Sequence, residues 1–330
     1  MRYLITGGAG FIGSHLADAL VARGDEVTIL DDLSTGRKHN VAHLLAAEKA
    51  RLVEGSVLDA DLVTDCLRQT DACFHLASAV GVQLIVESTL DSLLRNARGN
   101  DVVMTAAARE GKRMLFTSTS EVYGKNSSGA LTEDADRVLG SPLVARWSYA
   151  ITKAFGESLA HAHFRERGAE TIVARLFNTV GPRQSGAYGM VLPRFVQQAL
   201  SGKELTVFGN GTQSRCFAHV ADTVHALVLL MDCEDAIGQV FNVGSSDEIP
   251  IIELAARVID HANSESAIRL VPYDEAYGDG FEELGRRQPN TTRLRGTVEW
   301  APTRGVNEAI DDLIAYERSE AAAGRLRLAG

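Results

Sequence analysis

The sequence predicts an α/β protein with a doubly wound, mostly parallel sheet and a smaller, interleaved C-terminal lobe. Three observations predict this class: a glycine-rich turn joins a strand to a helix at the start, strands and helices alternate over residues 1–178, and the composition is typical of a globular protein. The chain has 330 residues, of which 45% are hydrophobic and 23% are charged. It is therefore long enough to bury a core without disulfides.

The first unit of the pattern consists of a strand, a turn, a helix and a second strand. Residues 2–6 are expected to form an apolar strand, 7–13 a glycine-rich turn, 12–22 an amphipathic helix and 26–30 the second strand. Two strands joined through a helix in this way run parallel, with a right-handed crossover.

The same alternation continues to residue 178. Further strands are expected at residues 51–54, 72–75, 113–117 and 171–176, and further helices at 60–67, 89–109 and 149–167. Six strands that alternate with helices predict one sheet covered on both faces.

The pattern changes after Asn178, where glycines and prolines interrupt the chain. Helices are expected at residues 192–200, 221–231 and 252–262, a strand at 240–243, a loop at 273–290 and a frayed helix or tail at 320–330. We assign 1–178 to a dinucleotide-binding domain, with 213–245 packing back onto it, and 179–212 and 246–330 to a substrate-binding lobe.

Charge and cysteine usage exclude several classes of protein. There are 33 basic and 43 acidic residues, which gives a net charge of −10 and argues against a nucleic-acid partner. The N-terminus lacks the apolar core of a signal peptide and no later segment is apolar enough to cross a membrane, so we expect a cytoplasmic protein without a membrane partner. The four cysteines show no metal-binding spacing, and no metal is expected.

Three glycines, Gly7, Gly10 and Gly13, lie between the first strand and the first helix. They permit a tight turn, close approach of a pyrophosphate to the backbone, and close packing of helix on strand, which is typical of a Rossmann dinucleotide site. Asp31 follows at the end of the second strand, where a carboxylate accepts hydrogen bonds from ribose hydroxyls and repels a 2′-phosphate. The predicted cofactor is therefore NAD.

Other residues at the strand ends are expected to line the cofactor site. These are Phe11, Ile12, Asp32, Ser34, Thr35, Gly36, Ser56, Val57, Leu76, Ala77, Ser78 and Asn96. His75, at the end of an apolar strand, is interpreted as a packed structural residue.

Tyr149 and Lys153 form a Y-x-x-x-K pattern at the start of a predicted helix, and this spacing places both side chains on one helical face. A phenol titrates near pH ~10, but the Lys153 ammonium and a positively charged nicotinamide are expected to lower the pKa of Tyr149. The hydroxyl of Thr119, after a strand aimed at the cofactor, is expected to bond to the reacting substrate oxygen. All three residues are present, which argues against the alternative of a non-catalytic NAD-binding regulatory protein.

Over residues 1 to about 315, the chain resembles the extended short-chain dehydrogenase/reductases that remodel nucleotide sugars: epimerases, dehydratases and decarboxylases. The resemblance rests on segments such as TGGAGFIGSHL (6–16), STSEVYG (118–124), YAITK (149–153) and RLFNTVGPR (175–183). It implies a UDP-sugar substrate and a homodimer formed through the helices at 89–109 and 149–167.

Three positions distinguish the branches of this family: Ser120, Glu121 and Arg146. The 4,6-dehydratases carry an Asp where this chain has Ser120, which disfavours dehydration. Glu121 together with Arg146 resembles the UDP-glucuronate decarboxylases that form UDP-xylose, in which oxidation at sugar carbon 4 precedes loss of carbon dioxide. The guanidinium of Arg146 suits the carboxylate, and Glu121 suits proton handling at carbon 5. The alternative is a UDP-sugar 4-epimerase, acting on UDP-glucuronate or UDP-glucose.

The remaining predicted residues bind the nucleotide half of the substrate. Asn178, Arg183, Arg215 and Arg287 are candidates for the diphosphate, since planar guanidinium groups match phosphate oxygens. Val191 and Leu192 are expected at the same site, and Thr206 and Phe208 are expected to contact the uracil.

Overall fold

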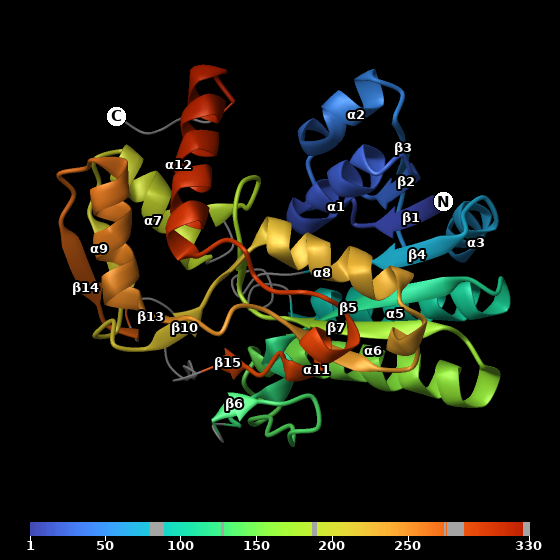
Figure 1. The fold of residues 1–330 in the computed structure, drawn as a ribbon. Helices are drawn as coiled ribbons and strands as arrows, with labels where there is room; N and C mark the ends of the chain where they lie inside the picture. The colour runs from blue at the N-terminus through green and yellow to red at the C-terminus, as the bar shows by residue number, and fades with distance from the viewer. Residues whose placement is uncertain (80–88, 127–128, 187–189, 274, 276–286, 326–330) are drawn as a thin grey trace.

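The computed structural model describes residues 1–79, 89–126, 129–186, 190–273, 275 and 287–325. Its centre is a seven-stranded sheet in which all neighbouring strands are parallel (Figure 1). The order across the sheet is β12 (Val240–Val243), β7 (Thr171–Leu176), β5 (Arg113–Thr119), β4 (Ala72–His75), β1 (Arg2–Thr6), β2 (Glu26–Asp31) and β3 (Ala50–Glu54). The predicted doubly wound parallel sheet is therefore confirmed, and its direction of winding reverses between β1 and β4.

Helices cover both faces of this sheet. On one face lie α1 (Phe11–Ala22) and α8 (Val220–Asp232), and on the other lie α3 (Ala60–Arg68), α5 (Thr89–Arg109) and α6 (Trp147–Arg167). Within β1, Tyr3 and Ile5 belong to the first core and Leu4 to the second, as expected for a strand buried on both faces. The helices α5 and α6 lie side by side along the sheet (Figure 1). Two short helices, η1 (Lys38–Val41) and α2 (Ala42–Ala46), follow β2.

A third core, separate from the two on the faces of the sheet, holds the smaller lobe together. It is formed by α7 (Val191–Leu200), α9 (Ile251–Ala262) and α12 (Val306–Ala322), and it includes Leu192, Phe195, Leu254 and Leu313, all fully buried. Two pairs of short strands complete the lobe: β9 (Leu205–Phe208) with β14 (Ile268–Val271), and β10 (Ser214–Cys216) with β13 (Glu248–Pro250). None of these four strands was predicted from the sequence, because segments of three or four residues show too little alternation.

Short elements connect the two parts of the molecule. Strand β8 (Thr179–Val180) pairs with β11 (Ala218–His219), and β6 (Ala130–Leu131) pairs with β15 (Gln288–Pro289). The remaining elements are the 3-10 helices η2 (Ser120–Tyr123) and η4 (Glu234–Ala236) and the helix α11 (Thr292–Thr297).

Some predicted boundaries differ from the structure. Strand β5 extends two residues further than expected, to Thr119, and α6 begins two residues earlier, at Trp147, whose side chain is fully buried. The strand expected at 240–243 pairs with β7 and is the seventh strand of the main sheet. Most of the loop expected at 273–290 lies outside the described residues, but its end forms β15. Residues 320–322 belong to α12, and 326–330 also lie outside the described part.

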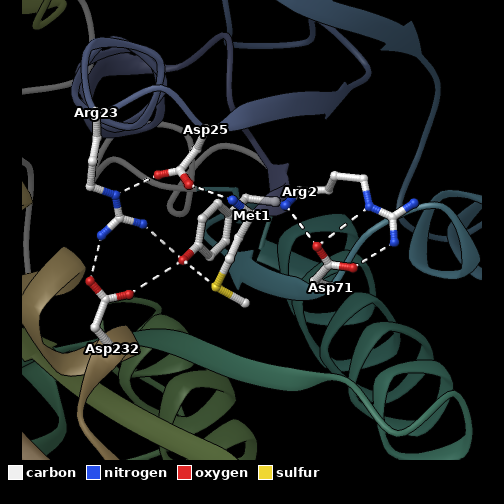
Figure 2. A network of polar contacts seen from close by, with 7 residues as sticks. Met1, Arg2, Arg23, Asp25, Asp71 and Asp232 are labelled. Carbon is white, nitrogen blue, oxygen red and sulfur yellow. Dashed lines mark hydrogen bonds and ion pairs between the residues drawn. The ribbon is translucent and has the colours of Figure 1, made fainter.

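Polar contacts fix the amino end of β1 against the ends of α1 and α8 (Figure 2). The Met1 amino group bonds to Asp25 Oδ1 at 2.7 Å, and Arg23 Nη2 donates to the Tyr3 hydroxyl at 2.8 Å. Arg23 also pairs with Asp25 and with Asp232, at the end of α8. This network lies at the amino ends of the strands. The carboxyl ends, at the opposite end of the sheet, are therefore available to form a binding site.

Candidate active site

A cavity of about 770 Å³ lies at the carboxyl ends of the central strands, between the sheet and the smaller lobe. It brings together nearly all of the predicted site residues. Those that line it are Gly7, Gly10, Phe11, Ile12, Gly13, Asp31, Asp32, Ser34, Thr35, Gly36, Ser56, Val57, Leu76, Ala77, Ser78, Asn96, Thr119, Ser120, Glu121, Arg146, Tyr149, Lys153, Asn178, Arg183, Val191, Leu192, Phe208, Arg215 and Arg287. Thr206 is the predicted residue that does not line it.

The glycine turn leaves no room for side chains. Gly7 has a φ of +71°, and a Cβ built on it would lie 2.8 Å from the backbone nitrogen of Ala77. A Cβ on Gly13 would collide with the carbonyl oxygen of Gly7. Helix α1 begins directly after Gly10, so the N–H groups of its first turn face the cavity beside Phe11 and Ile12. This arrangement fits the pyrophosphate of a dinucleotide.

The carboxylate of Asp31 is fixed at the end of β2. Its two oxygens accept the backbone N–H groups of Ala9 and Leu33, each at 2.9 Å. Burial raises the pKa of Asp31, while these two hydrogen bonds oppose the rise. Gly36 passes so close that a Cβ there would lie 2.7 Å from Asp31 Oδ1. The loop after β2 therefore folds around the Asp31 carboxylate. Asp31 itself lies at the end of β2, where the sequence predicts a contact with the ribose.

Strand β4 ends in a segment held by α5. Asn96 Oδ1 accepts the Ala79 N–H at 2.8 Å and the Ser78 hydroxyl at 3.1 Å. His75 is fully buried and bonds to the Thr6 hydroxyl at 2.7 Å and to Asn100 Oδ1 at 3.1 Å. Burial lowers the pKa of His75 to about 3, so it is a neutral packed residue, as the sequence indicated.

Tyr149 and Lys153 lie on one face of α6, opposite the end of β5. Lys153 is 2% exposed, and its Nζ donates to the carbonyl oxygen of Thr117 at 2.8 Å. The Nζ atom also lies 5.9 Å from the centre of the Tyr149 ring. The hydroxyl oxygen of Thr119 accepts the Glu121 N–H at 3.2 Å and caps η2. Tyrosine, lysine and threonine are therefore brought together as predicted.

The pKa of Tyr149 differs from the sequence-based expectation. Burial raises it above its usual range, the charge of Glu121 raises it further, and a hydrogen bond with Ser78 opposes them. Lys153 therefore does not produce a phenolate without further positive charge. The pKa of Lys153 is itself lowered to about 7, because burial disfavours the ammonium, although Glu157 raises it.

Glu121 lies among three arginines. Arg287 Nη1 donates to its Oε1, and Arg146 Nη2 lies 3.6 Å from its Oε2. Removal from water would raise the pKa of Glu121, but Arg287, Arg146 and Arg215 hold it below its usual value. The cluster therefore contains an ionised carboxylate and an excess of positive charge. Arg287, which the sequence predicts as a candidate for the diphosphate, lines the cavity and contacts Glu121.

The lobe supplies the other end of the cavity. Asn178 Nδ2 donates to the Cys216 carbonyl at 3.0 Å, and Arg183 Nη1 pairs with Asp18 of α1 at 2.8 Å. Arg183 has a φ of +68°, which is uncommon for a side chain other than glycine and marks a held conformation. Val191 and Leu192 enter from the start of α7.

Thr206 faces away from the cavity and is held by Gln198, which donates from its Nε2 to the Thr206 hydroxyl at 3.0 Å. In its place the cavity has Arg194, whose guanidinium lies 4.1 Å from the centre of the Phe208 ring. Sequence reasoning missed Arg194, although its position among apolar residues of the predicted helix was a usable signal.

The described part of the chain contains neither a metal-binding cluster nor a membrane-spanning helix. No group of three His, Cys, Asp or Glu side chains there is placed to hold a metal ion. None of the described helices combines the length and apolar character needed to span a bilayer.

Comparisons with known proteins agree with this architecture. The sequence model of the NAD dependent epimerase/dehydratase family matches residues 3–244. The chain is 38% identical to the UDP-N-acetyl-alpha-D-glucosaminuronate decarboxylase of Bacillus cytotoxicus, with 96% of this chain and 98% of that protein aligned. It is 36% identical to UDP-glucuronic acid decarboxylase 1 of Danio rerio, with 96% of this chain and 72% of that protein aligned.

Among solved structures, the chain is similar to a UDP-glucose 4-epimerase with UDP-glucose from Thermotoga maritima. The TM-score is 0.86 at 26% identity, and the match covers 97% of this chain and 100% of that one. With its glycine turn, its Tyr149–Lys153 pair and these matches, the chain belongs to the NAD dependent epimerase/dehydratase family.

Proposed function

We propose that the protein is an NAD-dependent UDP-glucuronate decarboxylase that forms a UDP-pentose of the UDP-xylose type through a 4-keto intermediate. The observation that carries this proposal is the contact of Glu121 with Arg287 and Arg146, on the cavity wall that also holds Tyr149. One carboxylate among three guanidinium groups leaves positive charge that a substrate carboxylate would neutralise. The two decarboxylase relatives support the same reading.

The residues at the dinucleotide end of the cavity fit NAD. The first turn of α1 and the glycines before it suit the pyrophosphate, and Asp31 suits the ribose hydroxyls while repelling the extra phosphate of NADP. Bound NAD supplies a two-electron acceptor beside sugar carbon 4, and later returns the same electrons.

Tyr149 is the group that takes the proton from the hydroxyl on sugar carbon 4. Its pKa is raised in the chain by burial and Glu121, so positive charge on the bound cofactor and on Lys153 is required to stabilise the phenolate. Thr119 donates its hydroxyl to the same substrate oxygen and holds it beside Tyr149. When the carbon 4 oxygen becomes negatively charged as carbon dioxide leaves, both hydroxyl groups stabilise it.

Arg146 and Arg287 are proposed to bind the substrate carboxylate, which replaces Glu121 as their ion-pair partner. The Nε of Arg287 is buried and has no hydrogen-bond partner among the described residues, which leaves a donor for a ligand. Once these guanidinium groups turn to the substrate, they no longer depress the pKa of Glu121. Glu121 then gains a proton more readily and is placed to deliver it to carbon 5 after decarboxylation.

The nucleotide is assigned to the lobe. Arg183, Asn178 and Arg215 are proposed at the diphosphate, and the aromatic face of Phe208 with Arg194 at the uracil. Ser120, next to Thr119 on η2, is proposed to bond to the sugar.

A 4-epimerase is the second candidate, and the fold shared with the Thermotoga maritima enzyme favours it. An epimerase uses the same Tyr149, Lys153 and Thr119 but keeps the carboxyl carbon. A neutral substrate such as UDP-glucose would leave the arginines around Glu121 without a second anion, which disfavours an epimerase of neutral sugars; an epimerase of UDP-glucuronate is distinguished by the mass of the product.

The test is incubation of the purified protein and NAD with UDP-glucuronate, followed by mass spectrometry of the nucleotide sugar. We expect a product lighter by one carbon dioxide. UDP-galacturonate of unchanged mass would establish the epimerase instead. UDP-N-acetylglucosaminuronate should be assayed in parallel, because the Bacillus cytotoxicus relative acts on it.

We further propose a homodimer formed through α5 and α6. Leu90 and Leu94 on α5 and Ile151 and Phe155 on α6 are exposed, and the two helices lie side by side. Such a paired helical face is self-complementary about a two-fold axis. Light scattering should give twice the chain mass, and Phe155→Glu should give the monomer mass; a parent protein of single-chain mass contradicts the proposal.

The proposed location is the cytoplasm. Cys66, Cys73, Cys216 and Cys233 are all free thiols, which suits a reducing compartment. Fractionation of the source cells tests this, and recovery in an exported fraction contradicts it.

A further inference from the structure

Glu157 is a buried carboxylate that the proposed reaction does not use. It lies on α6, one turn after Lys153 and two turns after Tyr149, and only 3% of its surface is exposed. Arg175 of β7 donates to it twice, from Nε at 2.9 Å and from Nη2 at 2.8 Å. The Ser118 hydroxyl and Arg137 Nη2 also donate to it. A carboxylate with four donors is held in a single position.

These contacts reach the end of β5 and the turn that follows it. Ser118 directly precedes Thr119, so its bond to Glu157 ties the strand end to α6. Arg175 Nη1 donates to the Tyr123 hydroxyl at 2.8 Å, and Tyr123 is the last residue of η2. The Tyr123 hydroxyl donates in turn to Asn242 Oδ1 at 2.7 Å. The Glu157–Arg175 pair therefore fixes the turn that carries Ser120 and Glu121, through Ser118 at one end and Tyr123 at the other.

Glu157 also acts on Lys153 through its charge. Lys153 is surrounded by the neutral His75 of β4, by Phe116 and the Thr117 carbonyl of β5, and by Tyr149 on its own helix. Glu157 is the group that raises the pKa of Lys153, against burial, which lowers it. Arg175 and Arg137 face Glu157 from the opposite side.

We propose that Glu157 is a positioning residue of the active site: its carboxylate keeps Lys153 charged and locks β5 and η2, which carry Thr119, Ser120 and Glu121, in register with Tyr149. The inference rests on the proposed roles of Tyr149 and Lys153. A carboxylate with a structural role alone would contribute stability without moving the pH dependence of turnover.

The experiment is a pH titration of Lys153 by NMR in protein whose lysines carry an isotope label at the ε-carbon. The chain has six lysines, and the Lys153 signal is assigned by its loss in Lys153→Met. Glu157→Gln removes the charge and keeps the shape, and Glu157→Asp keeps the charge. The matched control is Asp222→Asn, because Asp222 is equally buried at 3% and accepts two hydrogen bonds, from Thr303 and Arg304, outside the cavity.

We expect the Lys153 midpoint to fall by about one pH unit or more in Glu157→Gln and to stay near the parent value in Glu157→Asp and Asp222→Asn. The alkaline limb of kcat should move to lower pH in Glu157→Gln only. An unchanged midpoint in folded Glu157→Gln overturns the proposal. If that variant does not fold, Arg137→Gln decides: it frees Glu157 from one arginine and must raise the midpoint, and no change overturns the proposal. The titration needs no substrate, so it is independent of whether UDP-glucuronate is decarboxylated.

Discussion

Neighbouring charges decide whether Tyr149 can act as a base. Burial and Glu121 raise its pKa, and Lys153 is held by Thr117 with its Nζ 5.9 Å from the centre of the phenol ring. A phenolate at neutral pH therefore requires positive charge beyond that of the chain itself. In the proposed mechanism this dependence links the proton step to cofactor binding, because the bound cofactor would supply that positive charge.

Tyr149→Phe removes the accepting oxygen and leaves the ring in place. We expect turnover to fall by on the order of 10³-fold, since a positioned acid–base group contributes about 10²–10⁴-fold. NAD affinity, measured by calorimetry, should change little, because the glycine turn is untouched. A near-parental rate would show that another group is the base.

Arg146→Leu tests the carboxylate site. Activity on UDP-glucuronate should fall by on the order of 100-fold, equivalent to ~2.7 kcal/mol of transition-state stabilisation. Arg257→Leu is the matched control, because Arg257 pairs with Glu253 outside the cavity. Equal losses in both variants, or none in either, would remove Arg146 from substrate binding.

Glu121 makes the stability of the protein depend on pH in the acid range. Arg287 and Arg146 hold the folded-state pKa of Glu121 below its usual value, although removal from water opposes them. Its contribution is therefore present above that value and is lost as the pH falls through the folded-state pKa. In Glu121→Gln, the loss of unfolding free energy between pH 7 and pH 4, measured with urea, should be smaller than in the parent. An equal or larger loss would contradict the ion-pair account.

At the scale of elements, the turn from β1 into α1 depends on glycine at one point of closest packing. Gly13→Ala places a Cβ against the Gly7 carbonyl, so unfolding free energy should fall by about 1–3 kcal/mol, and NAD affinity should fall with it. Gly296→Ala in α11 is the control, because no atom lies within 4 Å of a Cβ there. Thermal unfolding and NAD titration of both variants check this; equal behaviour would contradict the packing argument.

The sequence predicted those parts of the site that are contained in a short segment of the chain. The glycine turn, Asp31, and the Tyr149–Lys153 pair each depend on a short segment whose chemistry can be read directly, and they lie together in the cavity. The Arg287–Glu121 contact joins residues 166 positions apart. It depends on the pairing of β15 with β6, two strands of two residues each, which no periodicity reveals. The network of Glu157, Ser118 and Arg175 was missed for another reason: its residues lie on α6, β5 and β7, and only the packing of the helix on the sheet brings them together.

At the scale of the whole molecule, the active site requires both parts of the chain. The sheet supplies the dinucleotide turn and the Tyr149 face, and the lobe supplies Arg215, Arg287 and the Phe208–Arg194 pair. Strand β8, which pairs in parallel with β11 and connects the two parts, lines the cavity. In the proposed binding mode, a substrate spans both parts, with its sugar at the sheet and its nucleotide at the lobe.

The fate of the substrate's carboxyl carbon tests the central claim most directly. The parent protein with NAD is incubated with UDP-glucuronate that carries an isotope label in this carbon, and the label is followed in dissolved carbonate and in the nucleotide sugar. We predict that the label appears in carbonate in step with formation of the UDP-pentose, and that Tyr149→Phe releases it more slowly by on the order of 10³-fold. Label retained in a nucleotide sugar with an inverted carbon 4 would contradict decarboxylation and identify an epimerase.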